Sequence, residues 1–83
     1  MDSPSPRVSV TEAARRHRID DEDILHAYRN AMTIEHQDDG FIMITGAKRD
    51  GELLEVGFRY DPDSDTNFIL HAMFARQQYL RPL

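Results

Sequence analysis

The sequence predicts an α+β domain with two N-terminal helices, followed by a four-stranded antiparallel sheet and a short C-terminal helical turn. Three observations predict it. Apolar residues recur at helical spacing only within residues 11–30. Runs compatible with β-strands follow over residues 33–60 and are separated by two Asp-Gly turns. A further apolar run at residues 68–73 supplies the fourth strand.

The N-terminal segment differs from the rest of the chain. Residues 1–8 contain Ser-Pro-Ser-Pro, in which each proline disfavours helix at the preceding residue, and they offer little to bury. The 83-residue chain is long enough for one hydrophobic core and too short for two. We therefore expect a disordered lead at residues 1–8 and a single folded domain at residues 9–83.

Two helices are expected before the sheet. The first covers residues 11–17, where good helix formers follow a candidate cap at Ser9 or Thr11. The second covers residues 21–30, because Asp20 can cap it and the acids of its first turn are favoured by the helix dipole.

The four strands are expected at residues 33–37, 41–48, 52–60 and 68–73. The third alternates clearly, and its apolar side chains form one face that should be core: Leu54, Val56, Phe58 and Tyr60. The second is apolar on both faces, so it suits a central strand covered by the helices on one side and by a partner or a tail on the other. We expect residues 75–80 to form a last helical turn.

Charge is distributed unevenly along the chain, whose formal net charge is −5. Residues 7–18 carry four Arg and one Glu, and residues 66–83 carry two Arg and no acid. Residues 19–65 carry thirteen acids and four bases. A polyanion such as a nucleic acid would therefore meet the ends of the sequence and not its middle.

The composition excludes several functional classes. The chain has no cysteine, which excludes disulfides and thiolate metal sites and favours a cytoplasmic location. We expect neither a secretory signal peptide nor a membrane span, because no basic segment leads into an apolar run and no stretch approaches roughly 18 apolar residues. A Gly-rich phosphate loop and a Gly-x-Ser-x-Gly elbow are missing, and the four histidines lack metal-ligand spacing. We therefore expect neither a cofactor nor a metal.

The candidate catalytic residues lie on the last two predicted strands and the tail: Glu55, Arg59, His71 and Arg76. RNA cleavage by transesterification needs a base for the 2′-OH proton, an acid for the leaving 5′ oxygen and cations on the phosphate. We expect Glu55 to act as the base and His71 as the acid or a phosphate ligand. The two arginines would hold the phosphate, and three further cations would bind the substrate: Lys48, Arg49 and Arg81.

Two alternatives remain open. In the first, the four candidate residues serve the structure alone. Glu55 and Arg59 are then an i, i+4 pair on one solvated sheet face, His71 caps or packs in a strand, and Arg76 pairs with the acidic middle of the chain. Residues 10–24 could form a DNA-binding helix-turn-helix. Against DNA binding, Arg18 occupies the position of the usual glycine, and the acids at residues 21–23 would face the phosphates.

Two short motifs resemble the BrnT-type toxins of the RelE-like superfamily. Arg16-His17-Arg18-Ile19, followed by Asp21-Glu22-Asp23, is similar to the Lys-His-Gly-Val-(polar)-Glu-Glu opening of those toxins. Ile69-Leu-His-Ala-Met-Phe-Ala-Arg76, which runs on to Tyr79, is similar to their apolar strand leading into Ser-Ala-Arg and a polar helix. The resemblance covers roughly residues 11–80, and Arg76 is the position that carries over best.

The resemblance implies an endoribonuclease, ribosome-independent or ribosome-linked, that a small DNA-binding antitoxin holds silent. Together with the candidate residues, it predicts a metal-independent toxin of a type II toxin–antitoxin module that cleaves mRNA, in one RelE/BrnT-like domain at residues 9–83. The alternative is a non-catalytic protein-interaction module of the same fold, either a degenerate toxin or an adaptor. Whether the chain forms a homodimer is left open.

Overall fold

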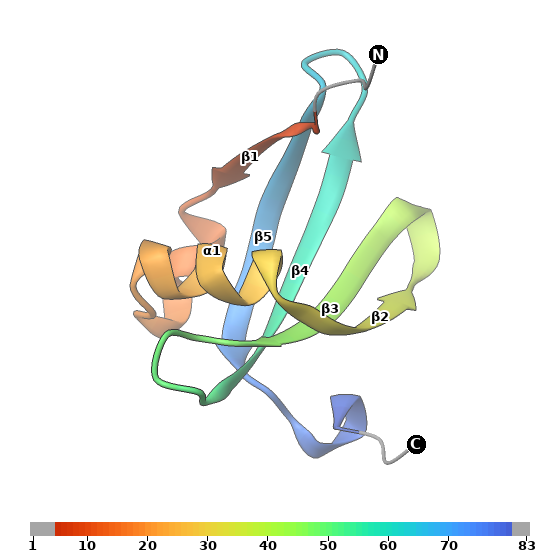
Figure 1. The fold of residues 1–83 in the computed structure, drawn as a ribbon. Coiled ribbons are helices and arrows are strands. Elements are labelled where there is room, and N and C mark those ends of the chain that lie inside the picture. Colours follow the sequence, from red (N-terminus) through yellow and green to blue (C-terminus); the bar gives the residue numbers. More distant parts are fainter. Residues whose placement is uncertain (1–4, 81–83) are drawn as a thin grey trace.

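The computed structural model describes residues 5–80, which form a five-stranded mixed sheet with one α-helix packed on one face (Figure 1). The strands lie in the order β1-β5-β4-β3-β2. β1 runs parallel to β5, and the other neighbouring strands are antiparallel. In chain order the elements are β1 (Arg7–Val10), η1 (Ala13–His17), α1 (Asp21–Arg29), β2 (Ala31–His36), η2 (Asp38–Gly40), β3 (Phe41–Ala47), β4 (Leu53–Asp61), β5 (Thr66–Phe74) and η3 (Gln77–Tyr79), where η denotes a 3-10 helix.

The prediction of two N-terminal helices and a four-stranded antiparallel sheet is wrong. The first predicted helix is only the 3-10 helix η1, which ends where Arg18 adopts the left-handed conformation at φ 59°. The missed element is β1, whose Val8 and Val10 pack against the core. A four-residue strand carries little local signal, and β1 exists because it pairs with a strand that begins only at Thr66.

The predicted disordered lead overlaps this strand. Its residues 1–4 lie outside the described residues. Its last two residues, Arg7 and Val8, belong to β1, and the Arg7 backbone N–H donates to the Asp65 carbonyl at 3.0 Å. Regular structure therefore begins two residues before residue 9.

Helix α1 begins at the predicted residue and lies close against β3. Asp20 at its N-cap makes no side-chain hydrogen bond to the helix backbone. At the other end, the Asn30 side-chain amide donates to the His26 carbonyl at 2.8 Å. A Cβ at Gly46 of β3 would overlap the Ala27 carbonyl, so this close approach of helix and strand requires a glycine.

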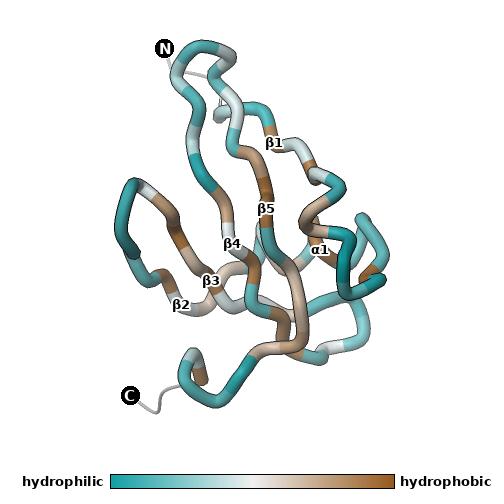
Figure 2. Tube along the Cα trace, turned by 180° about the vertical axis from the view of Figure 1, so that it is seen from behind, coloured by the Kyte–Doolittle hydropathy of each residue, from teal (hydrophilic) through white to brown (hydrophobic). Residues whose placement is uncertain are grey.

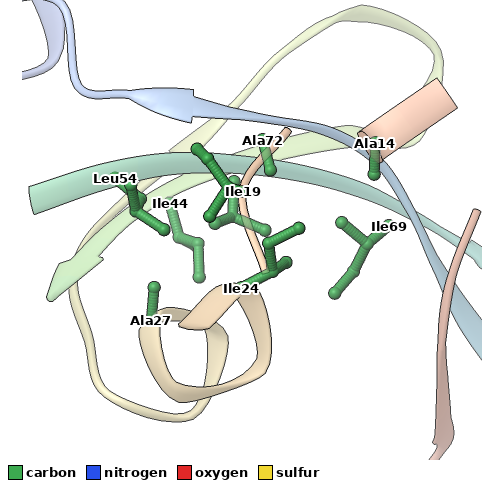
Figure 3. Close-up of a cluster of buried hydrophobic side chains, with 9 residues drawn as sticks. Ala14, Ile19, Ile24, Ala27, Ile44, Leu54, Ile69 and Ala72 are labelled. Carbon is green, nitrogen blue, oxygen red and sulfur yellow. The ribbon is translucent and has the colours of Figure 1, made fainter. Parts of the chain in front are cut away.

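The hydrophobic core lies between α1 and the sheet face that it covers, with η1 closing one side (Figure 3). Its buried side chains come from η1, from the link between η1 and α1, from α1 and from β3, β4 and β5: Ala14, Ile19, Ile24, Ala27, Ile44, Leu54, Val56, Ile69 and Ala72. Leu54 and Val56 are buried as predicted. Tyr60 was expected on the same face but is 44% exposed, because the β4–β5 hairpin projects beyond α1 (Figure 1).

The opposite face of the sheet is covered in part by the C-terminal segment. After β5 the chain turns back below the sheet toward β2 (Figure 2). There the Gln37 side-chain amide donates to the Tyr79 hydroxyl at 3.0 Å. Met43, Thr45 and Glu55 are buried on this face. The tail, one of the two covers that the sequence left open for the central strand, thus lies on this face.

Candidate functional site

Three of the four predicted catalytic residues meet on the sheet face opposite α1. Glu55 lies on β4 between the core residues Leu54 and Val56, so the alternation of the strand turns it away from the helix. His71 lies on the neighbouring β5, and Arg76 follows that strand. His71 Nε2 lies 2.7 Å and Arg76 Nη2 lies 2.8 Å from the same carboxylate oxygen, Glu55 Oε2.

A β-bulge in β5 determines which face His71 occupies. Ile69 and His71 pair with consecutive residues of β4, so Leu70 between them is an extra residue without a cross-strand partner. In an uninterrupted strand His71 would share the face of Ile69, which is core. The bulge shifts the alternation by one residue and directs His71 toward Glu55.

The Glu55 carboxylate is buried and fully hydrogen-bonded. Its side chain has no exposed surface. Oε1 accepts hydrogen bonds from the backbone N–H of Arg76 at 2.9 Å and from its Nε at 3.0 Å, while Oε2 is bonded to His71 and to Arg76 Nη2. Burial would raise the pKa of Glu55, but the hydrogen bonds from Arg76 and His71 outweigh burial and lower it. Glu55 is therefore ionised at neutral pH and presents no free oxygen to a substrate.

His71 and Arg76, unlike Glu55, reach the surface. Their side chains are 26% and 48% exposed. We assign the proton of the neutral His71 ring to Nε2, because that nitrogen faces an ionised carboxylate. This assignment leaves Nδ1 able to accept a proton. The buried carboxylate thus fixes the orientation and tautomer of one imidazole and the position of one guanidinium.

His17, which the sequence analysis did not select as a catalytic residue, lies beside His71. The two ring centroids are 6.1 Å apart and the ring planes meet at 77°. His17 is the last residue of η1 and is exposed. In the sequence, its only distinguishing feature was its place in the motif Arg16-His17-Arg18-Ile19. The structure therefore adds a second imidazole to the predicted set.

Arg59 lies apart from this cluster. It is four residues from Glu55 along β4, which corresponds to about 13 Å at the rise of a β-strand. Its Nε donates to the Asp39 carbonyl at 3.2 Å, and its guanidinium lies 5.8 Å from the centre of the Phe41 ring. The structure brings Arg59 to the same sheet face as Glu55 but not into contact with it.

The predicted substrate-binding cations between β3 and β4 are paired with carboxylates. Arg49 binds three acids at the start of α1: Asp20, Glu22 and Asp23. Hydrogen bonds from Arg49 lower the pKa of Asp23 to about 2. Lys48 pairs with Asp50 at 2.7 Å. These pairs tie the turn to itself and to α1, and Arg81, the third predicted cation, lies outside the described residues.

Residues 5–80 offer neither a metal-binding cluster nor a membrane-spanning helix. These residues contain no group of three or more His, Asp or Glu placed to hold a metal ion. Their helices are too short and too polar to traverse a bilayer.

No protein-family model, no curated protein and no solved structure matches this chain. The resemblance to BrnT-type toxins therefore stays a prediction that rests on the two motifs.

Proposed function

We propose that this chain is a metal-independent endoribonuclease that cleaves RNA by transesterification. The observation that carries the proposal is the buried Glu55 carboxylate, which holds His71 and Arg76 together at the surface beside His17. An acid–base pair and a phosphate-binding cation in one place are what this chemistry requires. As the resemblance implies, the substrate would be mRNA, and a small antitoxin would hold the enzyme silent.

The reaction forms a bond between the 2′ oxygen and the adjacent phosphorus and breaks the bond from phosphorus to the 5′ oxygen. His71 accepts the 2′-OH proton at Nδ1, and protonated His17 donates a proton to the leaving 5′ oxygen. Arg76 offsets the negative charge that accumulates on the phosphate oxygens. The products are a 2′,3′-cyclic phosphate and a 5′-hydroxyl, and Glu55 acts through the two side chains that it positions.

Substitution of His71 tests this assignment. We expect His71→Ala to lower the cleavage rate of a labelled single-stranded RNA at least 100-fold, because general acid–base catalysis contributes roughly 10²–10⁴-fold. Arg76→Ala should also reduce the rate. The assay is run with a chelator present, and the cut ends are analysed for the cyclic phosphate.

The matched control is His36→Ala, which removes an exposed histidine from β2. It should cleave as the wild type does. A wild-type protein that leaves RNA intact, or equal rates for His71→Ala and His36→Ala, would sink the proposal.

The exposed edge strand β2 favours a second candidate function, that of a non-catalytic protein-interaction module. This strand forms one edge of the sheet, and all six of its residues are exposed. Met32 is 67% and Ile34 is 64% exposed. An edge strand presents free backbone N–H and C=O groups to which a partner strand can add. The partner that the resemblance implies is the antitoxin.

Calorimetric titration with the product of a neighbouring short reading frame tests this module. Ile34→Glu should weaken binding at least 10-fold, because a carboxylate would enter an apolar contact. Leu80→Glu, at another exposed apolar position, is the control. If both variants bind as the wild type does, β2 is not the interface; a dimer of the chain itself that Ile34→Glu abolishes would assign β2 to a second copy.

A further inference from the structure

A row of three side chains crosses the sheet on the same face as Glu55. Phe41 of β3 lies directly opposite Arg59 of β4, and Arg59 lies directly opposite Phe68 of β5. Residues paired in this way point to the same face, and Arg59 shares the face of Glu55 because an even number of residues separates them. The Arg59 guanidinium is exposed and lies 5.8 Å from the centre of the Phe41 ring.

This row lies next to His71. The Phe41 ring packs over Gly57, where a Cβ would overlap it, and Gly57 is the residue that pairs with His71. Gly57 is two residues from Arg59, so the two rows are about 7 Å apart. His71 thus lies between two stacked cations, Arg59 on Phe41 and Arg76, whose guanidinium is 5.5 Å from the centre of the Tyr79 ring.

The surface beside the row is hollowed, and the aromatic rings that line it suit a ligand with flat rings. A hollow of about 300 Å³ is lined by Thr11, Arg59, Tyr60, Asp61, Phe68 and Leu70. Its one carboxylate, on Asp61, accepts a hydrogen bond from the Ser64 hydroxyl at 2.7 Å. Among residues 5–80 no carboxylate pairs with the Arg59 guanidinium, and its Nε donates to the Asp39 backbone carbonyl.

We infer that the row formed by Phe41, Arg59 and Phe68 is a subsite that stacks an unpaired nucleobase next to the phosphate held at His71 and Arg76. Aromatic rings and guanidinium planes bind unpaired bases by stacking, and they accept any base because each has a flat π face. A duplex keeps its bases inside and cannot use such a site. The inference rests on the proposed function, because it places this subsite beside that cleavage centre.

Binding of RNA that cannot be cleaved tests the subsite independently of catalysis. The probe is a fluorescent single-stranded 2′-O-methyl RNA of about eight nucleotides, which lacks the attacking hydroxyl, and anisotropy gives its Kd. We expect Phe68→Leu and Arg59→Gln each to raise the Kd at least 10-fold. Arg29→Gln, the same change at an exposed position on α1, should stay within twofold of the wild type. A duplex of the same sequence should bind at least 10-fold more weakly than the single strand.

The outcomes separate the subsite from the cleavage proposal. The subsite would be overturned if the wild type did not bind the probe, or if all variants bound it with the Kd of the wild type. It would also be overturned if the duplex bound as tightly as the single strand. Stacking that persists in a protein that cuts no RNA would overturn the cleavage proposal alone. Where RNA is cut, Phe68→Leu should raise KM more than it lowers kcat. Arg59→Gln changes an exposed side chain, so it carries the test if Phe68→Leu does not fold.

Discussion

Glu55 is a charged side chain without accessible surface, and its charge is tolerated because donors surround it. The ionised carboxylate accepts hydrogen bonds from two side chains and one backbone N–H, which compensates for the water that it lost. Such a carboxylate is poorly placed to meet RNA as a base. In our proposal that role passes to His71, and Glu55 becomes the residue that positions it.

Glu55→Gln should destabilise the fold at neutral pH. The amide N–H groups of Gln would face the N–H groups of Arg76 or His71, so buried donors would lack an acceptor. An unsatisfied buried polar group costs about 1–3 kcal/mol. Denaturant unfolding followed by circular dichroism gives the free energy. Glu35→Gln, at an exposed position on β2, is the control and should have little effect.

The destabilisation by Glu55→Gln should depend on pH. The pKa of Glu55 is lower in the folded chain than in the unfolded chain, where it is about 4.3. The stabilisation of the fold by ionised Glu55 is therefore complete above about pH 4.3, and it is lost as the pH falls through the lowered pKa of the folded chain. The difference in unfolding free energy between wild type and variant should shrink below pH 4.3. A difference that stays constant down to pH 2 would contradict this account.

At the level of elements, the contact between α1 and β3 depends on Gly46. The helix carbonyl at Ala27 occupies the space that a side chain at this position would need. Because backbone atoms cannot rotate away as a flexible side chain can, the helix has to shift to accept even a methyl group.

Gly46→Ala should therefore lower the free energy of unfolding by about 1–3 kcal/mol, the usual cost of overpacking a core. Thermal unfolding would show it as a lower Tm. Glu35→Ala, at an exposed position on β2, serves as the comparison. An unchanged Tm for Gly46→Ala would mean that α1 is held less tightly than the structure indicates.

The elements that sequence reasoning placed well are those with local causes. The helix at residues 21–29 has an apolar stripe and an acidic first turn. The strands at residues 41–47 and 53–61 are bounded by Asp-Gly turns, and the second of them alternates clearly. The parallel strand β1 and the bulge at Leu70 were missed. Both depend on pairing with residues distant in sequence, which no local pattern encodes.

At the level of the whole molecule, basic and acidic side chains that are far apart in the sequence pair with one another within residues 5–80. Arg49 forms ion pairs with the acids at the start of α1, and Lys48 forms one with Asp50 in the hairpin turn. The sequence analysis had assigned both cations to substrate binding. The sequence identified Glu55, His71 and Arg76 as candidate catalytic residues from their residue types and one motif, and the fold brings them together. His17 could not be identified in this way, because only the docking of η1 beside β5 places it there.

The bulge in β5 also determines how related sequences would have to be compared with this one. In a chain without the extra residue at Leu70, the position facing Glu55 is the one directly after the core isoleucine. A relative that carries the same pair of side chains would then read Ile-His, and a correct alignment would open a one-residue gap within the strand. Ungapped comparison would match its histidine to Leu70 and miss the shared site.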